Sequence, residues 1–463
     1  MWLLMGLASA NEITCGTLHH WDAIENAVSP ILPPPPPSGD LEIRDPLNLP
    51  NVRTSEHFAF FWGDEIDVST EKSTSFLEAL EEAWDIFVDD VGFDAPFGSN
   101  HFYFNVYLMD LADPHLEYAG GYYSTDNQGF PFIAINPSYL QYGDEKRKSL
   151  VFHEFYHAMQ LGTGVPVTLL NKWYIEGSAA WVQQYYLQDT CDAAGAFLLK
   201  PQFTLRYFAS LSGGVDVDGR YVYGSCLLLT SMQDDGIPPN AVHRSFQEHD
   251  GFVEDWWDDY LSEQGSSFAE AVGDMAAKNV NLLYSENYYP YLENTIAYYP
   301  DENFRYADVI FGQTDGWVDA PTETLPEWYG YNHIRLQEAA DFQMLFGFEG
   351  EAVGSAGTPA RWKVHLVTDH GYKEIELDEN HAGDMAVEGL STVNEGVLSV
   401  VAYGDEYVAG ETFAYRYTIT PNAANSYKPF GCQSVTPHML WCIWGGVFGL
   451  VWRRKRKRRS TQD

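Results

Sequence analysis

The spacing of apolar residues along this chain predicts helices and strands in two distinct regions. A buried helix is expected at residues 149 to 159, because the apolar residues there leave few solvent-facing positions. An amphipathic helix is expected from about 71 to 91, between short apolar strands at 58 to 62 and 102 to 108. From about 321 to 425 the pattern changes to short alternating runs between turn residues. The chain is therefore predicted to be an α+β protein.

Composition divides the chain further. Residues 49 to 320 are predicted to form the main domain, and residues 321 to 425 a small antiparallel β-sandwich that serves as an accessory domain. A proline run at 33 to 37 forms a stiff linker. Residues 11 to 48 are therefore expected to lie outside the core as an N-terminal segment.

Both ends of the chain resemble targeting signals. Residues 1 to 10 read as the end of a signal peptide with an Ala-x-Ala cleavage signal, and a buried N-terminal helix is the alternative. Within residues 426 to 463, Cys432 precedes an apolar run at 439 to 452 and then a basic block. This order resembles the C-terminal sorting tags of bacterial exported proteins, including the myxobacterial type. It implies a secreted or cell-surface protein with transient or permanent membrane association; a plain membrane anchor and a nuclear-localisation-like run are alternatives.

The chain is strongly acidic. It contains 66 Asp and Glu against 26 Lys and Arg, which gives a formal net charge of −40 at pH 7. Such a charge repels nucleic acid and anionic membrane surfaces, so no nucleic-acid partner is expected. It favours cationic substrates or tolerance of salt, and a saline habitat is the simpler interpretation.

The cysteines are too few for a disulfide scaffold. The chain has 5, and none are spaced as Cys-x-x-Cys, so no cysteine-based zinc site is expected. In an exported protein, Cys191 and Cys226 could form one bridge, although connectivity does not follow from sequence.

Candidate chemistry lies in the predicted buried helix. His153 and His157 are four residues apart and lie on one helical face, where both imidazoles can reach a single metal ion. Glu154 points to the side of that face, where it can take a proton from a metal-bound water. Such groups are costly to bury unless a divalent metal compensates them. The alternative is a pair of core histidines satisfied by backbone carbonyls.

Glu176 is the candidate for the third protein ligand that a catalytic zinc ion requires. It follows His157 after residues 158 to 175, in an apolar, helix-competent stretch where an unpaired carboxylate would be costly. The other common pattern has a third histidine soon after the second, and Gln160 and Thr163 occupy those positions here.

These residues resemble the signature of the gluzincin zinc metallopeptidases, and above all that of the M1-type aminopeptidases. The third-ligand Glu of that type is followed by Gly, another residue and Ala, as Glu176 is here. The resemblance covers about residues 100 to 235 and implies a zincin-like metallopeptidase domain. It also implies that Zn2+ is held by His153, His157 and Glu176, with Glu154 as the general base.

A tyrosine completes the resemblance. Residues 221 to 224 resemble the Tyr-x-x-Gly element whose tyrosine stabilises the oxyanion in that group, which makes Tyr221 the catalytic candidate. Tyr223 is an alternative, and both could be packing residues.

One departure from the M1 pattern affects the expected substrate. The Gly-x-Met-Glu-Asn strand that captures the substrate's amino terminus does not occur in the sequence. Exopeptidase specificity is therefore unsupported, and an endopeptidase acting on polypeptides is expected. In zincins the strand before the zinc helix is typically an exposed sheet edge, so residues 129 to 136 are expected to form that edge, with ordinary core as the alternative.

The expected reaction is hydrolysis of a peptide bond by Glu-assisted attack of a zinc-bound water. Zinc and Tyr221 would share the charge that develops on the carbonyl oxygen. The alternative function is a catalytically inactive surface binding protein that contains zinc on a peptidase fold.

Overall fold

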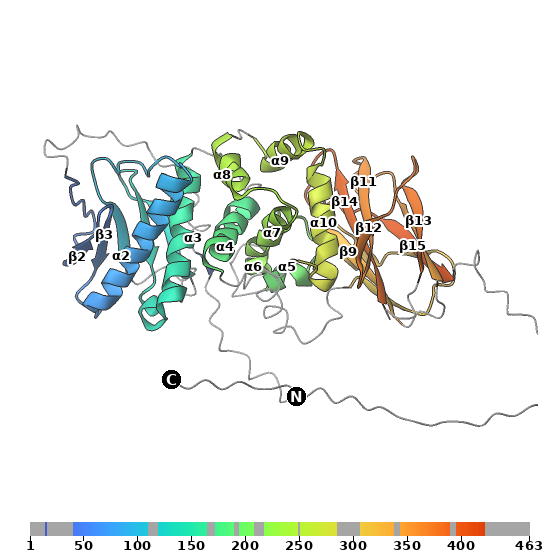
Figure 1. Cartoon of the computed structure of the whole chain (residues 1–463), viewed down its shortest axis with the longest axis horizontal. Helices are drawn as coiled ribbons and strands as arrows, with labels where there is room; N and C mark the ends of the chain where they lie inside the picture. Colours follow the sequence, from blue (N-terminus) through green and yellow to red (C-terminus); the bar gives the residue numbers. More distant parts are fainter. Residues whose placement is uncertain are drawn as a thin grey trace, which may run out of the picture. The chain divides into compact units, whose positions relative to one another are not determined.

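The computed structural model describes residues 14–15, 40–109, 119–163, 172–188, 194–207, 217–248, 251–284, 306–337, 343–388 and 395–421 (Figure 1). The described residues belong to one compact unit that ends at Asn422. The predicted signal peptide, proline-rich linker and sorting tag lie outside the described residues. The domain boundaries expected from composition stay predictions.

The fold is α+β, as predicted: a mixed sheet comes first, then a helical region, then two further sheets (Figure 1). The order of strands in the first sheet is β1-β5-β6-β4-β3-β2. Strands β3, β4 and β6 are parallel to one another, β2 runs antiparallel to β3, and β5 runs antiparallel to β6 but parallel to β1. The strands are β1 (Thr14–Cys15), β2 (Asn51–Thr54), β3 (Phe58–Trp62), β4 (Phe104–Leu108), β5 (Ala119–Thr125) and β6 (Pro131–Ile135).

The expectation that the strand before the buried helix lies at the sheet edge is wrong. This strand, β6, pairs with β4 on one side and with β5 on the other, and is therefore internal. The antiparallel strand β5 lies nearer the edge, and within the described residues β1 alone follows it in the sheet. Apolar spacing along a single strand does not specify its neighbours, because pairing joins residues that are distant in sequence.

Helices α2 (Thr70–Trp84) and α3 (Asp144–Gly162) pack against each other and against this sheet (Figure 1). α2 begins after Ser69, whose hydroxyl caps the helix by accepting a hydrogen bond from the Lys72 N–H, and it continues as a π-helix to Asp90. α3 follows β6 through the short 3-10 helix η3 (Pro137–Gln141). The Phe155 ring of α3 meets the Phe58 and Phe104 rings of β3 and β4 edge to face, which fixes α3 under the sheet.

The helical region continues from α3. α4 packs against α3, α6 and α7, and α10 packs against α7. The helices are α4 (Lys172–Leu187), α5 (Ala194–Leu199), α6 (Val217–Gly224), α7 (Cys226–Asp234), α8 (Pro239–Glu248), α9 (Val253–Ser262) and α10 (Phe268–Asn281). Cys226 is disulfide-bonded, and its candidate partner Cys191 lies outside the described residues. Among the helices in the described ranges, none is long and apolar enough to cross a membrane.

Two sheets form the C-terminal part. One has the order β13-β10-β15-β8 and is antiparallel throughout, and the other has the order β12-β11-β14-β9-β7 with a parallel pair at β7 and β9. α10 packs on β11 and β14, which joins this part to the helical region. The strands are β7 (Asp308–Phe311), β8 (Val318–Asp319), β9 (Tyr331–Gln337), β10 (Gln343–Gly350), β11 (Ala360–Thr368), β12 (Gly371–Glu374), β13 (Ala382–Glu388), β14 (Glu395–Gly404) and β15 (Tyr415–Pro421).

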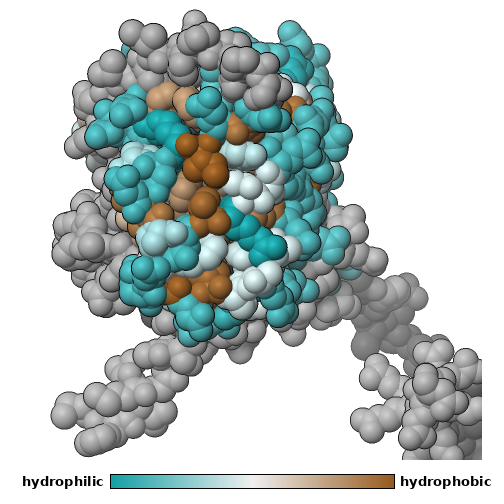
Figure 2. All heavy atoms as spheres, turned by 90° about the vertical axis from the view of Figure 1, so that its left-hand side faces the viewer, coloured by the Kyte–Doolittle hydropathy of each residue, from teal (hydrophilic) through white to brown (hydrophobic). Residues whose placement is uncertain are grey.

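The end of the molecule that carries β2, β3 and α2 is largely hydrophilic. Figure 2 shows this end, where hydrophobic residues form a narrow strip across the coloured surface. A groove of about 380 Å³ is lined by Arg53 of β2 and by acidic residues of α2 and the following π-helix, namely Glu78, Glu81, Glu82 and Asp85. This acidic groove agrees with the excess of carboxylates in the sequence.

Candidate metal centre

α3 carries the two histidines into the interior. His153 and His157 are 4 % and 0 % exposed, and Glu154 is 0 % exposed. These polar side chains are buried because α3 lies between the first sheet and α4, so that nearly every side chain in its central turns packs against another element. Their enclosure requires compensation by nearby polar groups or by an ion.

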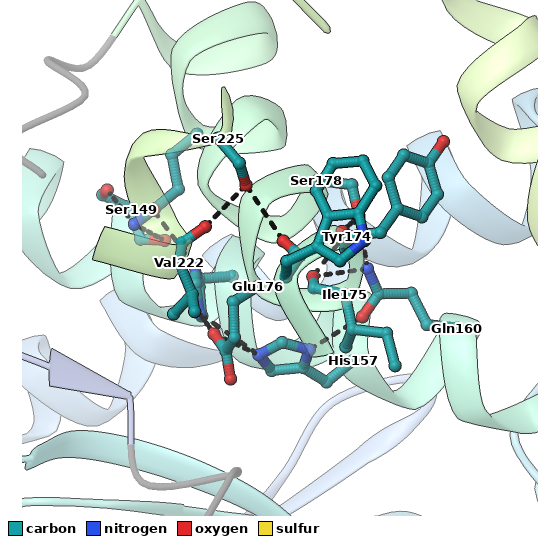
Figure 3. A network of polar contacts seen from close by, with 12 residues as sticks. Ser149, His157, Gln160, Tyr174, Ile175, Glu176, Ser178, Val222 and Ser225 are labelled. Carbon is teal, nitrogen blue, oxygen red and sulfur yellow. Dashed lines mark hydrogen bonds and ion pairs between the residues drawn. The ribbon is translucent and has the colours of Figure 1, made fainter. Parts of the chain in front are cut away.

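α4 brings Glu176 to the same place. Glu176 is 0 % exposed and lies in the second turn of α4. The next residue, Gly177, allows α4 to approach the start of α7 closely, because a Cβ at that position would overlap Ser225 Oγ. The Ser225 hydroxyl there hydrogen-bonds the backbone oxygens of Trp173 and Val222 (Figure 3). Glu176 therefore supplies a side chain to the centre, and Gly177 permits the close approach of α4 to α7.

Three side-chain atoms converge at the centre. His153 Nε2 lies 3.2 Å from Glu176 Oε2 and 3.2 Å from His157 Nε2, and His157 Nε2 lies 3.4 Å from Glu176 Oε2. Ligands about 2.0–2.1 Å from a tetrahedral metal ion would be about 3.3 Å apart. The three atoms thus already have the separation that such an ion requires, and this group could hold a metal ion.

Two glutamines fix the orientation of the imidazoles. Gln160 Oε1 lies 2.7 Å from His157 Nδ1, and Gln183 Oε1 lies 3.1 Å from His153 Nδ1. Figure 3 shows the His157 ring between Gln160 and the Glu176 carboxylate. Because the amide oxygen of each glutamine is an acceptor, each Nδ1 must carry the proton, which leaves the Nε2 of a neutral imidazole as a lone-pair acceptor.

The glutamines are themselves held by their amide nitrogens. Gln160 Nε2 donates to the Ile175 carbonyl oxygen at 2.9 Å and to Ser178 Oγ at 2.8 Å (Figure 3). Gln183 Nε2 donates to the carbonyl oxygen and the hydroxyl of Ser149, at 3.1 and 2.8 Å. These bonds fix which end of each amide faces its histidine. Outer hydrogen bonds of this kind typically orient the histidines of metal sites.

The electrostatics of Glu176 also suit a cation. Burial alone would raise its pKa, but when the imidazoles also carry a proton on Nε2, the charge of His157 and hydrogen bonds from both histidines outweigh this effect and lower the pKa of Glu176 to about 2. Burial likewise lowers the pKa of His157, and the nearby Glu176 and Glu154 carboxylates reverse that effect and raise it. A cation or a proton therefore compensates the convergent acceptors, so the two compete for this centre.

Glu154 lies beside the group, under β5. A Cβ at Gly121 of β5 would come within 3.2 Å of Glu154 Cγ, within 3.3 Å of its Oε1 and within 2.8 Å of the Ala134 carbonyl oxygen. Only glycine gives this close approach of the strand to the glutamate. The base candidate is therefore positioned by a strand that the sequence did not indicate.

The structure places the two tyrosines differently. The Tyr221 hydroxyl donates a 2.9 Å hydrogen bond to the carbonyl oxygen of Phe203, and its ring packs against Phe197 and Tyr207. The ring centre of Tyr223 lies 6.0 Å from that of His153. Both tyrosines are in α6. The contacts of Tyr221 are those of a packing residue, and Tyr223 is the tyrosine beside the centre.

Sequence reasoning missed Gln160, Gln183 and Gly121 as parts of this site. In the sequence, Gln160 stands out only as a position without histidine, although a glutamine three residues after a ligand can reach the ligand's ring on the same helical face. The only advance signal for Gln183 is its spacing of one heptad from Glu176 on a single helix. Gly121 carries no local signal, because its role depends on packing across the sheet.

The chain is similar to a known protein family. The model of DUF6055, a family of unknown function, matches residues 42–368. The matched segment runs from before β2 to the end of β11 and contains both histidines, Glu154 and Glu176. No curated protein matches the chain.

Proposed function

Since the chain belongs to the DUF6055 family, whose function is unknown, we propose its function from the centre itself: zinc-dependent hydrolysis of peptide bonds. The observation that carries the proposal is the convergence of His153 Nε2, His157 Nε2 and Glu176 Oε2 within 3.4 Å, with the Glu154 carboxylate near enough to raise the pKa of His157. Three protein ligands leave a tetrahedral ion one position for water or substrate, which is the pattern of catalytic rather than structural zinc.

The residues around the centre have distinct roles in this proposal. A bound zinc ion supplies Lewis-acid chemistry and lowers the pKa of a bound water. Glu154 accepts the proton of the attacking water and later delivers it to the leaving amine. Gly121 of β5 lies against the Glu154 side chain, and the Glu154 carboxylate is near enough to His157 to raise the pKa of that imidazole. Gln160 and Gln183 keep both imidazoles in the tautomer that presents Nε2 inward.

Tyr223 takes the role that the sequence assigned to Tyr221. Its ring lies beside that of His153, so we take its hydroxyl as the candidate donor to the developing oxyanion. The Tyr221 hydroxyl instead donates its hydrogen bond to the Phe203 carbonyl oxygen. The proposed catalytic set is therefore Glu154 and Tyr223, with the two histidines and Glu176 as metal ligands.

The fold supports a zincin-like arrangement for the proposed peptidase. β5 runs antiparallel to β6 and contacts α3, so a strand next to the sheet edge, flanked in the described residues by only the two-residue β1, passes over the helix that carries the centre. An extended peptide can add to such an edge through its backbone, without needing its own amino terminus. This supports endopeptidase action on polypeptides. The two C-terminal sheets, whose Phe348 and Trp362 rings meet, form the proposed β-sandwich accessory part.

Export of the protein belongs to the same proposal. The disulfide at Cys226 favours an oxidising compartment, in line with a secreted or cell-surface protein. The acidic groove and the net charge of −40 favour a polypeptide rather than a nucleic-acid partner. Membrane association through residues 426 to 463 remains a proposal from the sequence.

One observation favours the alternative of an inactive zinc-binding protein. His153, His157, Glu154 and Glu176 are at most 4 % exposed, so the centre is enclosed. A closed centre suits a structural ion, and in that case the chain would be a surface binding protein that uses zinc for stability.

The test compares three zinc-loaded full-length proteins: wild type, Glu154→Gln, and Glu145→Gln as a control at an exposed glutamate of α3. Each is incubated with unfolded casein, and new peptide termini are identified by mass spectrometry. We expect internal cuts by wild type and the control, and at least ~100-fold fewer by Glu154→Gln. Equal zinc content with no cuts by any protein would favour the inactive binding protein. Equal cutting by Glu154→Gln would remove Glu154 as the base.

A further inference from the structure

β5 connects the edge of the first sheet to the proposed catalytic base. Its residue Gly121 lies against Glu154, and the strand as a whole contacts α3. One side of β5 is paired with β6, from Gly121 opposite Ile135 to Thr125 opposite Pro131. A peptide that reached the centre by adding to this sheet would therefore use the other side of β5.

That other side holds the chain's own N-terminal strand. β1 is parallel to β5, with Thr14 opposite Ala119 and Cys15 opposite Gly121. The residue of β5 that touches Glu154 is thus also the residue that pairs with β1. Neighbouring strands in a sheet are about 4.8 Å apart. β1 consequently runs one strand spacing from the strand that covers the base.

We infer that β1 occupies the edge of β5 on which a peptide would pair, and so limits access of extended peptides to the centre. This inference rests on the proposed peptidase function. A strand edge offers one row of backbone donors and acceptors, so β1 and a second strand cannot use the same positions together.

β1 is short enough to be displaced from β5 by another strand. β1 spans two residues, whereas β5 spans seven, and the register between β1 and β5 is interrupted after the first pair. Few backbone hydrogen bonds hold β1, so a longer extended segment with more of them can replace it. Displacement of β1, or cleavage of the chain after it, would open the edge.

The test disrupts the pairing of β1 by proline substitutions in the full chain and measures both hydrogen–deuterium exchange and cleavage. Thr14→Pro combined with Cys15→Pro removes two backbone N–H groups from the strand. Cys15→Ala is the matched control that removes the thiol and keeps the backbone, and Ala27→Pro places a proline elsewhere in the N-terminal segment. Hydrogen–deuterium exchange across β5 is measured on all zinc-loaded proteins, and cleavage of unfolded casein is measured in parallel.

We expect the double proline variant alone to exchange faster in Ala119–Thr125 and to cleave casein at least fivefold faster than wild type. Unchanged exchange would overturn the inference, because β1 would not be what protects this edge. Faster exchange with unchanged cleavage would also overturn it, since β1 would then not limit access. If exchange rises but neither protein cleaves, the peptidase function fails, whereas occupation of the edge by β1 stands.

Discussion

Gln160 Oε1 lies 2.7 Å from His157 Nδ1, and the same amide donates through Nε2 to Ser178 of α4 at 2.8 Å. One uncharged side chain thus orients a metal-ligand candidate and links the two helices that supply the centre. In many metal sites a carboxylate has this position and makes the imidazole more electron-rich. Here the amide fixes the tautomer without adding a charge.

Gln160→Ala is therefore expected to lower zinc affinity by about 10- to 100-fold, because His157 loses its orienting acceptor. Zinc dissociation constants measured by competition with a chromogenic chelator check this. Gln247→Ala, at an exposed glutamine of α8, is the control and should bind zinc as wild type does. Wild-type affinity in Gln160→Ala would show that the ring is held by other contacts.

Tyr223→Phe should reduce turnover by about 10²- to 10³-fold with zinc retained, because it removes the proposed oxyanion donor. Tyr221→Phe should leave turnover close to wild type and instead lower stability, since a buried hydrogen bond to Phe203 is lost. Casein cleavage rates and thermal unfolding of both variants test the pair. The reverse order of effects would restore Tyr221 as the catalytic tyrosine.

Gly177→Ala should destabilise the protein by about 1–3 kcal/mol, because its Cβ would overlap Ser225 Oγ between α4 and α7. In a Ser225→Ala background the overlap with oxygen is gone, so the same substitution should cost less. Urea unfolding of the four proteins gives a double-mutant cycle, with an expected coupling of about 1 kcal/mol. A coupling of zero would show that the destabilisation by Gly177→Ala does not come from overlap with Ser225 Oγ.

Acid should destabilise the fold through His243. Burial lowers the pKa of His243 to about 3, and its ring nitrogens lie 3.0 and 3.1 Å from the Tyr156 and Tyr186 hydroxyls. The folded state thus resists protonation that the unfolded chain accepts near pH 6.5. Stability is full above that pH and falls as pH drops toward 3, by about 2–3 kcal/mol at pH 4.5.

His243→Gln, which does not titrate, isolates this effect. Urea midpoints of wild type and variant are compared from pH 7.5 to 4.5. Release of metal in acid affects both proteins equally. Only the difference in how steeply their urea midpoints fall with pH therefore reports on His243. If the urea midpoints of both proteins fall equally steeply with pH, His243 is not responsible for the acid sensitivity.

Much of the centre could be predicted from local spacing. The positions of His153, Glu154 and His157 on one helix follow from a period of 3.6 residues, and the apolar residues around them indicate burial. Glu176 could be predicted because an unpaired carboxylate in an apolar helix requires a partner. The first inference uses spacing within one helix, and the second uses the cost of burying one charged group.

The rest depends on residues that meet only in three dimensions. Tyr221 and Tyr223 lie two positions apart on one helix, and the sequence does not distinguish which of their rings lies beside His153. The internal position of β6 and the contact of Gly121 with Glu154 result from strand pairing across the sheet. No periodicity within a single segment encodes these neighbours.

The division of the ligands between α3 and α4 has a mechanical consequence. An ion at the centre would cross-link the part of the protein built on the first sheet to the part built from helices, because α4 also packs on α6 and α7. Without the ion, only protons on the imidazoles can compensate the three acceptor atoms, which lie within 3.4 Å of one another, so the link between the two helices weakens as the pH rises and those protons are lost. Metal loss would therefore loosen the seam between α3 and α4 first and leave the C-terminal sheets intact.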